Sequence, residues 1–190
     1  MAKLRSIANV LAIGLTLAYP PAVYFGLQAM EPRTLGILLL AAIILRHWQS
    51  SRRFAATVET AEWIILGGLC CLALGIVAFN KEDLLLLYPA AVSLSLLILF
   101  GRTLRRPPSM IERIARLSVP DLPPAGVRYT RQVTGVWCGF FVLNATTSLS
   151  TVFMSREWWM LYNGFISYLL MGLLFAVEWI VRGKLQRHPA

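Results

Sequence analysis

The stretch Leu122-Pro123-Pro124-Ala125-Gly126-Val127-Arg128-Tyr129-Thr130-Arg131 opens a segment that continues through two long apolar runs to Val181. The segment combines a proline-built entry, paired arginines, aromatic residues and polar side chains inside apolar helix. Hydrocarbon about 30 Å thick is crossed by roughly 20 helical residues, which is the length of each run. The pattern therefore predicts two helices that cross a membrane and are joined by a short hairpin.

The composition of the whole chain extends this prediction. Of 190 residues, 57% are hydrophobic and only 14% are charged, and the mean hydropathy is +0.65. These values are unlike those of an ordinary soluble domain. At about 1.5 Å rise per residue, the chain has room for about six crossings with short connections. We expect an all-α polytopic membrane protein whose residues 1–190 form a single transmembrane domain.

Hydrophobic runs divide the chain into six expected spans. The first follows Lys3 and Arg5 as in a signal peptide, but no small-residue cleavage site follows, so we expect an uncleaved span kinked near Pro20-Pro21. The second run is the shortest, and its full crossing depends on snorkelling of its flanking arginines. A tight polar hairpin at Asn80-Lys81-Glu82-Asp83 separates the third and fourth. The expected spans are about 7–27, 34–48, 63–79, 84–100, 133–154 and 160–181.

The positive charges predict the orientation. A formal charge of +9 would suggest nucleic acid in a soluble protein, but here the arginines lie between apolar runs, so no nucleic-acid partner is expected. Lys and Arg accumulate in cytoplasmic loops. With six spans and both termini in the cytoplasm, fifteen basic residues lie on the inner side of the membrane. The outer loops keep only Arg33, Lys81 and Arg156.

The inner loop 101–132 is the largest polar segment, with seven arginines against Glu112 and Asp121. Within it, Ser109 and Glu112 have capping-box spacing, and Met110, Ile111, Ile114 and Leu117 fall on one side of a short helix. We expect an amphipathic helix at the membrane surface between the fourth and fifth spans. Three roles stay open: contact with anionic lipid headgroups, a connector without a partner, or docking of a cytosolic protein. The arginines expected to make such contacts are Arg105, Arg106, Arg113 and Arg116.

A set of polar and large aromatic residues recurs along one face of the fifth span and its entry. After Arg128 and Arg131 at the entry, three- and four-residue steps place this set on one side of the helix. The amide of Asn144 falls near the middle of the membrane, where it either joins helices by hydrogen bonding or contacts a substrate. The face comprises Thr130, Thr134, Trp137, Phe141, Asn144 and Ser148.

The sixth span begins after an outer hairpin that contains Trp158 and Trp159 at the expected interface depth. Tyr162 and Asn163 follow near the outer surface. Small residues at four-residue steps predict close packing, which we expect against the fifth span. Gly164, Tyr168 and Gly172 form this stripe.

The residues that usually carry enzyme chemistry form no constellation. Cys70, Cys71 and Cys138 lie inside apolar runs without metal-ligand spacing, and His47 and His188 lie in a loop and in the C-terminal tail. No nucleophile with an adjacent base is evident. We therefore expect no cofactor, no metal site, no disulfide and no enzymatic activity.

The second half of the chain carries a family resemblance. Leu122-Pro123, then Trp137-Cys138-Gly139-Phe140-Phe141, then Trp159 and Tyr162-Asn163-Gly164, resemble the C-terminal part of bacterial septation protein A, an inner-membrane intracellular-septation family. The pattern is also similar to a related, uncharacterised bacterial membrane family. Members of that family are sometimes encoded beside acyl-carrier-protein and ketosynthase genes of aryl-polyene type pathways. The resemblance covers about residues 107–182.

The resemblance implies an inner-membrane protein that takes part in building the cell envelope. The leading hypothesis is a non-enzymatic helper or scaffold of envelope biogenesis with an envelope-synthesis or division protein as partner. The alternative is a small carrier or lipid-handling transporter. The two hypotheses differ in whether the polar face of the fifth span lines a wet cavity or is sealed by packing.

Overall fold

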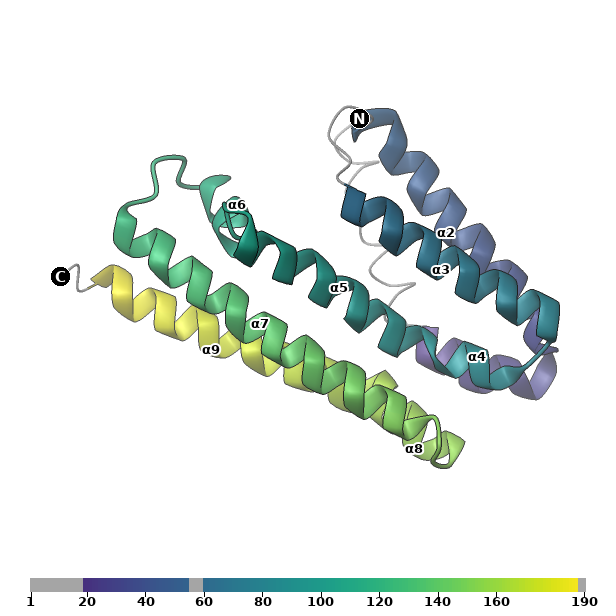
Figure 1. Cartoon of the computed structure of the whole chain (residues 1–190). Helices are drawn as coiled ribbons and strands as arrows, with labels where there is room; N and C mark the ends of the chain where they lie inside the picture. The colour runs from purple at the N-terminus through teal and green to yellow at the C-terminus, as the bar shows by residue number, and fades with distance from the viewer. Residues whose placement is uncertain (1–18, 55–59, 188–190) are drawn as a thin grey trace, which may run out of the picture.

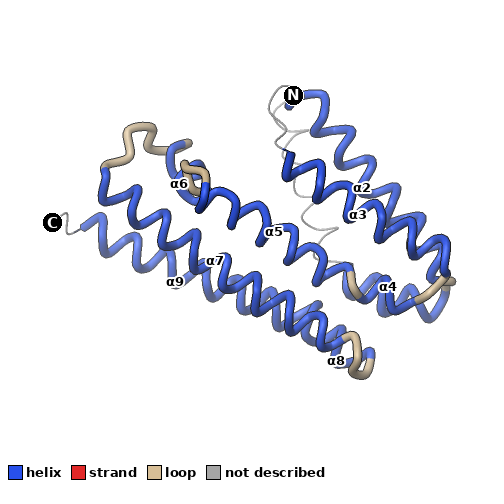
Figure 2. The backbone as a smooth tube through the Cα atoms, in the orientation of Figure 1, coloured by secondary structure: helices blue, strands red, loops and turns tan. Residues whose placement is uncertain are grey.

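The structure of the chain, a computed structural model, describes residues 19–54 and 60–187. Across these residues it is helical and contains no strand, which confirms the all-α prediction. Figure 1 and Figure 2 show a helical hairpin of α2 (Pro32–Phe54) and α3 (Thr60–Phe79) and, beside it, three long helices that run roughly along one another. These three are α5 (Tyr88–Arg105), α7 (Pro124–Thr151) and α9 (Ser167–Arg187).

Short helices complete the described chain. A helical segment at 19–29 precedes α2, and α4 (Glu82–Leu86) joins the hairpin to α5. The link between α5 and α7 contains α6 (Met110–Arg116). Before α9 come α8 (Arg156–Leu161) and a π-helical turn, η1 (Tyr162–Ile166). Residues 7–18 of the expected first span lie outside the described residues, whereas Pro20 and Pro21, where a kink was expected, lie at the beginning of the described helical segment 19–29.

Several expected boundaries differ from the observed ones. The second run forms a helix of 23 residues, much longer than its apolar part. Helix α7 begins at Pro124 rather than at 133, because a proline fits the first turn of a helix, where its missing N–H has no partner to lose. The basic loop expected at 101–132 is correspondingly shorter, since α5 extends to Arg105.

Two stretches of the described chain are long and apolar enough to cross a membrane. They are Glu82–Arg105 and Arg156–Gly183, while the apolar parts of α2 and α3, Pro32–Ile44 and Trp63–Phe79, are shorter. Helix α7 has the length, at 28 residues, but its hydroxyl and amide side chains lower its hydropathy. Membrane association is thus suggested weakly by length and composition, and the number of crossings is not determined by them.

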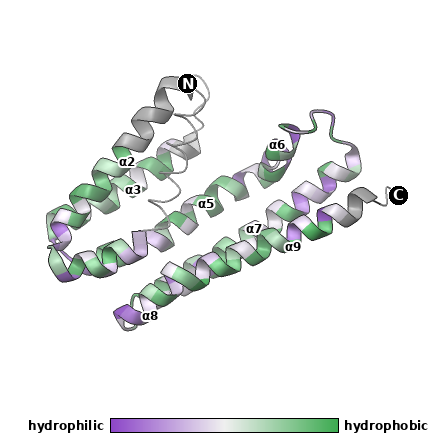
Figure 3. Ribbon diagram, turned by 180° about the vertical axis from the view of Figure 1, so that it is seen from behind, coloured by the Kyte–Doolittle hydropathy of each residue, from purple (hydrophilic) through white to green (hydrophobic). Residues whose placement is uncertain are grey.

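The distribution of side chains is inverted relative to a soluble protein. Large apolar side chains are exposed along the helices, for example Leu143 at 70%, Phe153 at 86% and Trp179 at 69%. Figure 3 shows hydrophobic residues, coloured green, along much of α5, α7 and α9. Hydroxyl and amide side chains such as Thr134 and Asn163 are buried instead, at 0% and 2% exposure. Monomeric soluble proteins rarely expose so much continuous apolar surface.

Helices α2 and α3 are held closely together at the end where α2 begins and α3 ends. A Cβ on Gly36 would lie 2.6 Å from the Cγ2 of Ile76, so the missing side chain lets the two helices approach. Asn80 adopts a left-handed φ of 51°, a conformation that asparagine tolerates. Its Oδ1 accepts a hydrogen bond of 2.8 Å from the backbone N–H of Arg33 at the start of α2. The tight turn predicted at Asn80-Lys81-Glu82-Asp83 is therefore observed between α3 and α4.

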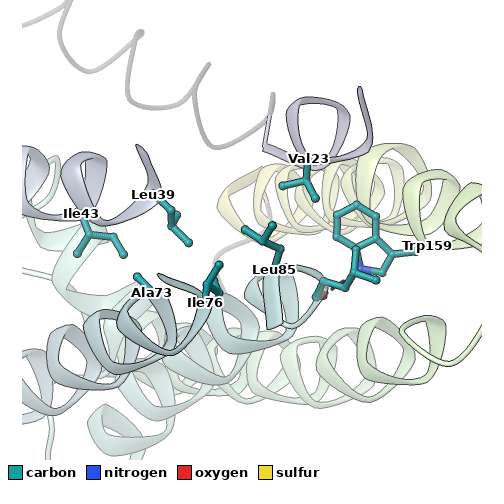
Figure 4. Close-up of a cluster of buried hydrophobic side chains, with 8 residues drawn as sticks. Val23, Leu39, Ile43, Ala73, Ile76, Leu85 and Trp159 are labelled. Carbon is teal, nitrogen blue, oxygen red and sulfur yellow. Dashed lines mark hydrogen bonds between the residues drawn. The ribbon is translucent and has the colours of Figure 1, made fainter. Parts of the chain in front are cut away.

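A cluster of buried apolar side chains joins the hairpin to α4 and α8. Figure 4 shows Leu39 and Ile43 of α2 facing Ala73 and Ile76 of α3, with Leu85 of α4 beside them. Val23 and Trp159 close the cluster at its other end. Trp159 is 1% exposed although its neighbour Trp158 is 56% exposed. The two adjacent tryptophans therefore differ in role: one belongs to the core and the other to the surface.

The expected fourth span is interrupted where α4 ends and α5 begins. Pro89 has no N–H to donate to the carbonyl of Leu85, four residues earlier. The hydroxyl of Tyr19 donates to that carbonyl at 3.1 Å, and the Nε1–H of Trp159 donates to the carbonyl of Leu86 at 2.9 Å. Two side chains distant in sequence thus satisfy backbone groups at the break.

The loops expected on the outer side of the membrane lie together. Arg156, at the start of α8, makes an ion pair with Glu82 at the start of α4. The hydrogen bond from the backbone N–H of Arg33 to the Oδ1 of Asn80 joins the start of α2 to the same α3–α4 turn. Three connections that are far apart in sequence therefore meet at one end of the helices.

The contact at the α4–α5 break predicts a stability effect. Trp159→Phe keeps most of the apolar volume but removes the donor to the Leu86 carbonyl, and leaving a buried acceptor unpaired costs about 1–3 kcal/mol. We expect a lower melting temperature in detergent.

Trp158→Phe is the matched control, because Trp158 is largely exposed. It should melt like the unmodified protein. Equal melting temperatures for the two variants would show that the Trp159 bond does not stabilise the break.

Candidate functional site

The candidate site is the inward face of α7 with the side chains that cover it. All six residues expected to share this face are buried. Together with side chains from neighbouring elements, they form three groups in order along the helix. The inner polar set is Thr103, Ser109, Glu112, Thr130 and Thr134; the aromatic block is Phe100, Trp137, Phe140, Phe141 and Phe175; the outer polar set is Ser93, Asn144, Ser148, Thr151, Tyr162, Asn163 and Ser167.

Asn144 is the centre of the outer polar set. Its Nδ2 donates to the Oγ of Ser93 on α5 at 2.9 Å, and its Oδ1 accepts from the hydroxyl of Tyr162 in η1 at 2.9 Å. The hydroxyl of Ser93 donates in turn to the carbonyl of Pro89 at 3.1 Å. One amide therefore links three elements, and both ends of that amide have a partner.

A second asparagine, Asn163, follows Tyr162 in the π-helical turn η1. The Nδ2 of Asn163 donates to the Oγ1 of Thr151 at 3.1 Å and to the carbonyl of Trp159 at 2.9 Å. Two atoms of this region, Ser148 Oγ and Asn163 Oδ1, are buried without a hydrogen-bond partner among the described residues. The widened turn aims Asn163 at α7, and π-turns within α-helices occur frequently at functional sites.

The aromatic block fills the middle of the α7 face. The ring of Phe100 from α5 lies 5.1 Å from that of Phe141, in an edge-to-face arrangement. Trp137 lies 4.5 Å from Phe175 of α9 and 5.7 Å from Phe141. Ring separations in this range are those of packed aromatic cores. The block separates the two polar sets from each other.

The inner polar set fastens α6 to the ends of two long helices. The N–H of Met110 donates to Thr103 Oγ1 on α5 at 2.9 Å, and the N–H of Ile111 donates to Thr134 Oγ1 on α7 at 3.2 Å. The first turn of a helix has backbone N–H groups without partners inside the helix, and these hydroxyls supply them. One half of the expected capping box is formed, since the N–H of Ser109 donates to the Oε2 of Glu112 at 3.3 Å, while the Oγ of Ser109 is buried without a hydrogen-bond partner among the described residues. Helix α6 thus rests on the bundle through its polar side.

The six arginines singled out in the sequence fall into two groups. Arg105, Arg106, Arg128 and Arg131 are exposed. Arg116 instead contacts the buried carboxylate of Glu112 at 2.8 Å, and the Nε of Arg113 donates to the carbonyl of Pro108 at 3.1 Å. The loop arginines are therefore not equivalent.

The stripe of small residues in the sixth span does not pack as expected. A Cβ on Gly172 would meet nothing within 4 Å, and one on Gly164 would meet Pro20, Pro21 and Met160 rather than α7. The predicted close approach of α9 to α7 at these glycines is therefore wrong. The Trp137–Phe175 ring contact explains why, because two large side chains between the helices keep their backbones apart. Tyr168, between the glycines, is half-buried.

Ionisable groups near the helix ends have shifted pKa values with identifiable causes. A hydrogen bond from Ser155 lowers the pKa of Glu157 in the outer hairpin, assisted by the Glu157 backbone N–H and Arg156. Burial, together with the carboxylate of Glu178, raises the pKa of Tyr129 at the entry to α7, and Arg182 opposes this shift. Both shifts move the group away from neutral pH, so each keeps its usual charge there.

The arrangement is suited to joining helices and offers little for bond chemistry. The polar atoms facing α7 are hydroxyls and amides, apart from Glu112 with its arginine partner. Within the described residues no group of three or more His, Cys, Asp or Glu side chains is placed to hold a metal ion. Sequence reasoning missed Ser93 and Thr103, although each is a polar residue in an apolar run, which is a signal that could have marked them.

Comparisons with protein-family models, with curated proteins and with solved structures found no match to this chain. The resemblance of residues 107–182 to the septation protein A family remains a prediction. The function of the chain is therefore inferred from the geometry of the α7 face and of the helix ends.

The two hydrogen bonds of Asn144 predict that its side chain contributes to the stability of the protein. Asn144→Leu removes both hydrogen bonds of the amide, and such bonds between membrane helices are worth roughly 0.6–2 kcal/mol. Thermal denaturation in detergent should show a lower melting temperature.

Ser148→Ala is the control, one helical turn away on the same buried face. Since its hydroxyl has no partner, removing it costs no hydrogen bond and should leave the melting temperature unchanged or slightly higher. Loss of cellular function at an unchanged melting temperature in Asn144→Leu would instead place Asn144 among substrate contacts.

Proposed function

We propose that this chain is a non-enzymatic integral protein of the bacterial inner membrane that crosses it six times and serves as a scaffold or helper in cell-envelope biogenesis. The observation that carries the proposal is the division of the α7 face into two polar sets with an aromatic block between them. A scaffold requires helices joined firmly, whereas a carrier requires a polar route.

The aromatic block argues against the carrier alternative. Trp137 and Phe141 are 4% and 3% exposed and pack on Phe100 between the polar sets. The outer set consists of neutral groups, and its central amide is satisfied at both ends. Coupled transport usually depends on ionisable groups within the membrane. The face is therefore better suited to sealing than to passage.

Two observations support six crossings with both termini inside. The loop contacts Arg156–Glu82 and Arg33–Asn80 gather three connections at one end, as alternate crossings require. Those connections hold the only three basic residues assigned to the outer side, against fifteen on the inner side. The apolar parts of α2 and α3 are short for a crossing, which thinning of the bilayer or snorkelling of flanking residues accommodates.

The topology has a direct test. Fusions of a phosphatase that is active only outside the cytoplasm, placed after Arg113 or at the C-terminus, should be inactive. A fusion in the outer hairpin after Ser155 is the positive control and should be active. Activity at Arg113 would contradict the six-span topology.

The scaffold role predicts a stable protein partner. Affinity purification of the tagged protein in mild detergent, read by mass spectrometry, should recover a defined envelope-synthesis or division protein. An unrelated tagged protein with six spans serves as the control for nonspecific recovery. Saturable uptake of a solute or lipid by liposomes containing the pure protein, without any such partner, would favour the carrier.

A further inference from the structure

We infer that α6 and the arginines beside it form a binding surface for anionic phospholipid headgroups, with Arg105, Arg106, Arg128 and Arg131 as the contacts. This inference rests on the proposed function insofar as it needs an inserted protein with this end in the cytoplasm. The partner is a lipid, and the arginines that contact it differ in part from those that the sequence indicated for lipid contact.

Helix α6 is fixed in place rather than hinged. Its first two N–H groups bond to Thr103 on α5 and Thr134 on α7, as described above. Ser109 and Glu112 on the same side are 2% and 5% exposed. Because the polar side faces the bundle, the opposite side is held outward in a constant orientation.

The outward side of α6 and of the turn after it carries three exposed apolar side chains beside the exposed Arg113: Ile114 is 54% exposed, Leu117 is 85% exposed and Val119 is 46% exposed. Helix α6 begins beside the end of α5, whose stretch from Glu82 is apolar enough to cross a membrane. Apolar side chains at the level where such a helix ends fit the boundary between headgroups and acyl chains.

Two of the loop arginines have structural partners. Arg116 holds the buried carboxylate of Glu112 and also donates to the carbonyl of Pro120 at 2.9 Å. Arg113 donates back to the carbonyl of Pro108. A buried carboxylate that lost its arginine would be costly, so Arg116 is committed to the loop, while Arg113 stays exposed as it makes its bond. The sequence indicated both for lipid contact, and the structure gives Arg116 the further task of holding α6.

The other four of the six arginines singled out in the sequence form two pairs on either side of α6. Arg105 and Arg106 follow Thr103 at the end of α5, and Arg128 and Arg131 precede Thr134 at the start of α7. All four are exposed. Residues 101–132 carry a formal charge of +5, and the buried one of their two carboxylates already has Arg116 as its partner. Basic residues at this level attract the anionic cytoplasmic leaflet.

The combination favours lipid over an acidic protein. A soluble acidic partner would use the charges, but it would leave the apolar side of α6 without a role. A bilayer surface engages both at once, because headgroups lie beside the arginines while Leu117 and its neighbours enter the acyl boundary.

The test uses the full-length protein in phosphatidylcholine bilayers with traces of spin-labelled phosphatidylglycerol or spin-labelled phosphatidylcholine. Electron paramagnetic resonance measures the fraction of each label that the protein immobilises. We expect a preference for phosphatidylglycerol that falls with added salt. The variant with Gln at positions 105, 106, 128 and 131 should lose this preference while keeping its melting temperature.

Two control variants separate charge from structure. Lys81→Gln removes an exposed positive charge at the other end and should leave the preference intact. Arg116→Gln should lower the melting temperature, because it leaves Glu112 without its partner. An inserted protein without the preference, or with a preference unaffected by the four substitutions, would overturn the inference alone. Extraction of the protein by alkaline carbonate would instead contradict the proposed function.

Discussion

The break at Pro89 is the constraint on which the described fold depends. A proline inside an apolar helix frees a carbonyl, and in lipid no water is present to satisfy it. Here the carbonyls of Leu85 and Leu86 receive hydrogen bonds from Tyr19 and Trp159, which belong to segments far apart in sequence. Each of those side chains must reach the break, so the segment at 19–29 and helix α8 are placed by the same two bonds. The buried apolar cluster forms around them.

The long helices follow a complementary rule. Their apolar side chains face outward, where contact with lipid would bring no gain from association, so specific pairing has to come from polar side chains and close packing. Asn144 does this for α5, α7 and η1, and Thr103 and Thr134 do it for α6. Because all these donors and acceptors are neutral, their pairing is insensitive to pH near neutrality. The structure is therefore joined by hydrogen bonds between helices at each end and by aromatic rings between them.

The sequence was sufficient to predict structure where a short repeat of residue types determines it. It was insufficient where the structure depends on a contact with a distant part of the chain. The face of α7 followed from three- and four-residue steps, and the turn at Asn80 from its polar residues. The break between α4 and α5 at Pro89 and the π-turn at Tyr162–Ile166 were missed, because each depends on what satisfies the freed backbone groups. The stripe at Gly164 and Gly172 was assigned to the wrong neighbour, since periodicity shows that residues share a face but not what lies opposite. The distinction between Arg116 and the exposed arginines likewise required the position of Glu112.

The two ends of the molecule differ in a way that bears on where partners bind. At the outer end, Arg156 is paired with Glu82, and the turn at Asn80 accepts a hydrogen bond from the start of α2, while Lys81 stays exposed. At the inner end, arginines remain exposed beside the apolar side of α6, and Glu112 is the buried exception with its own partner. Between the ends, the aromatic block leaves the polar sets unconnected, which removes the reason to expect a solute to link them. Under the proposed function and topology, this asymmetry would place the binding surface of a scaffold at the cytoplasmic face.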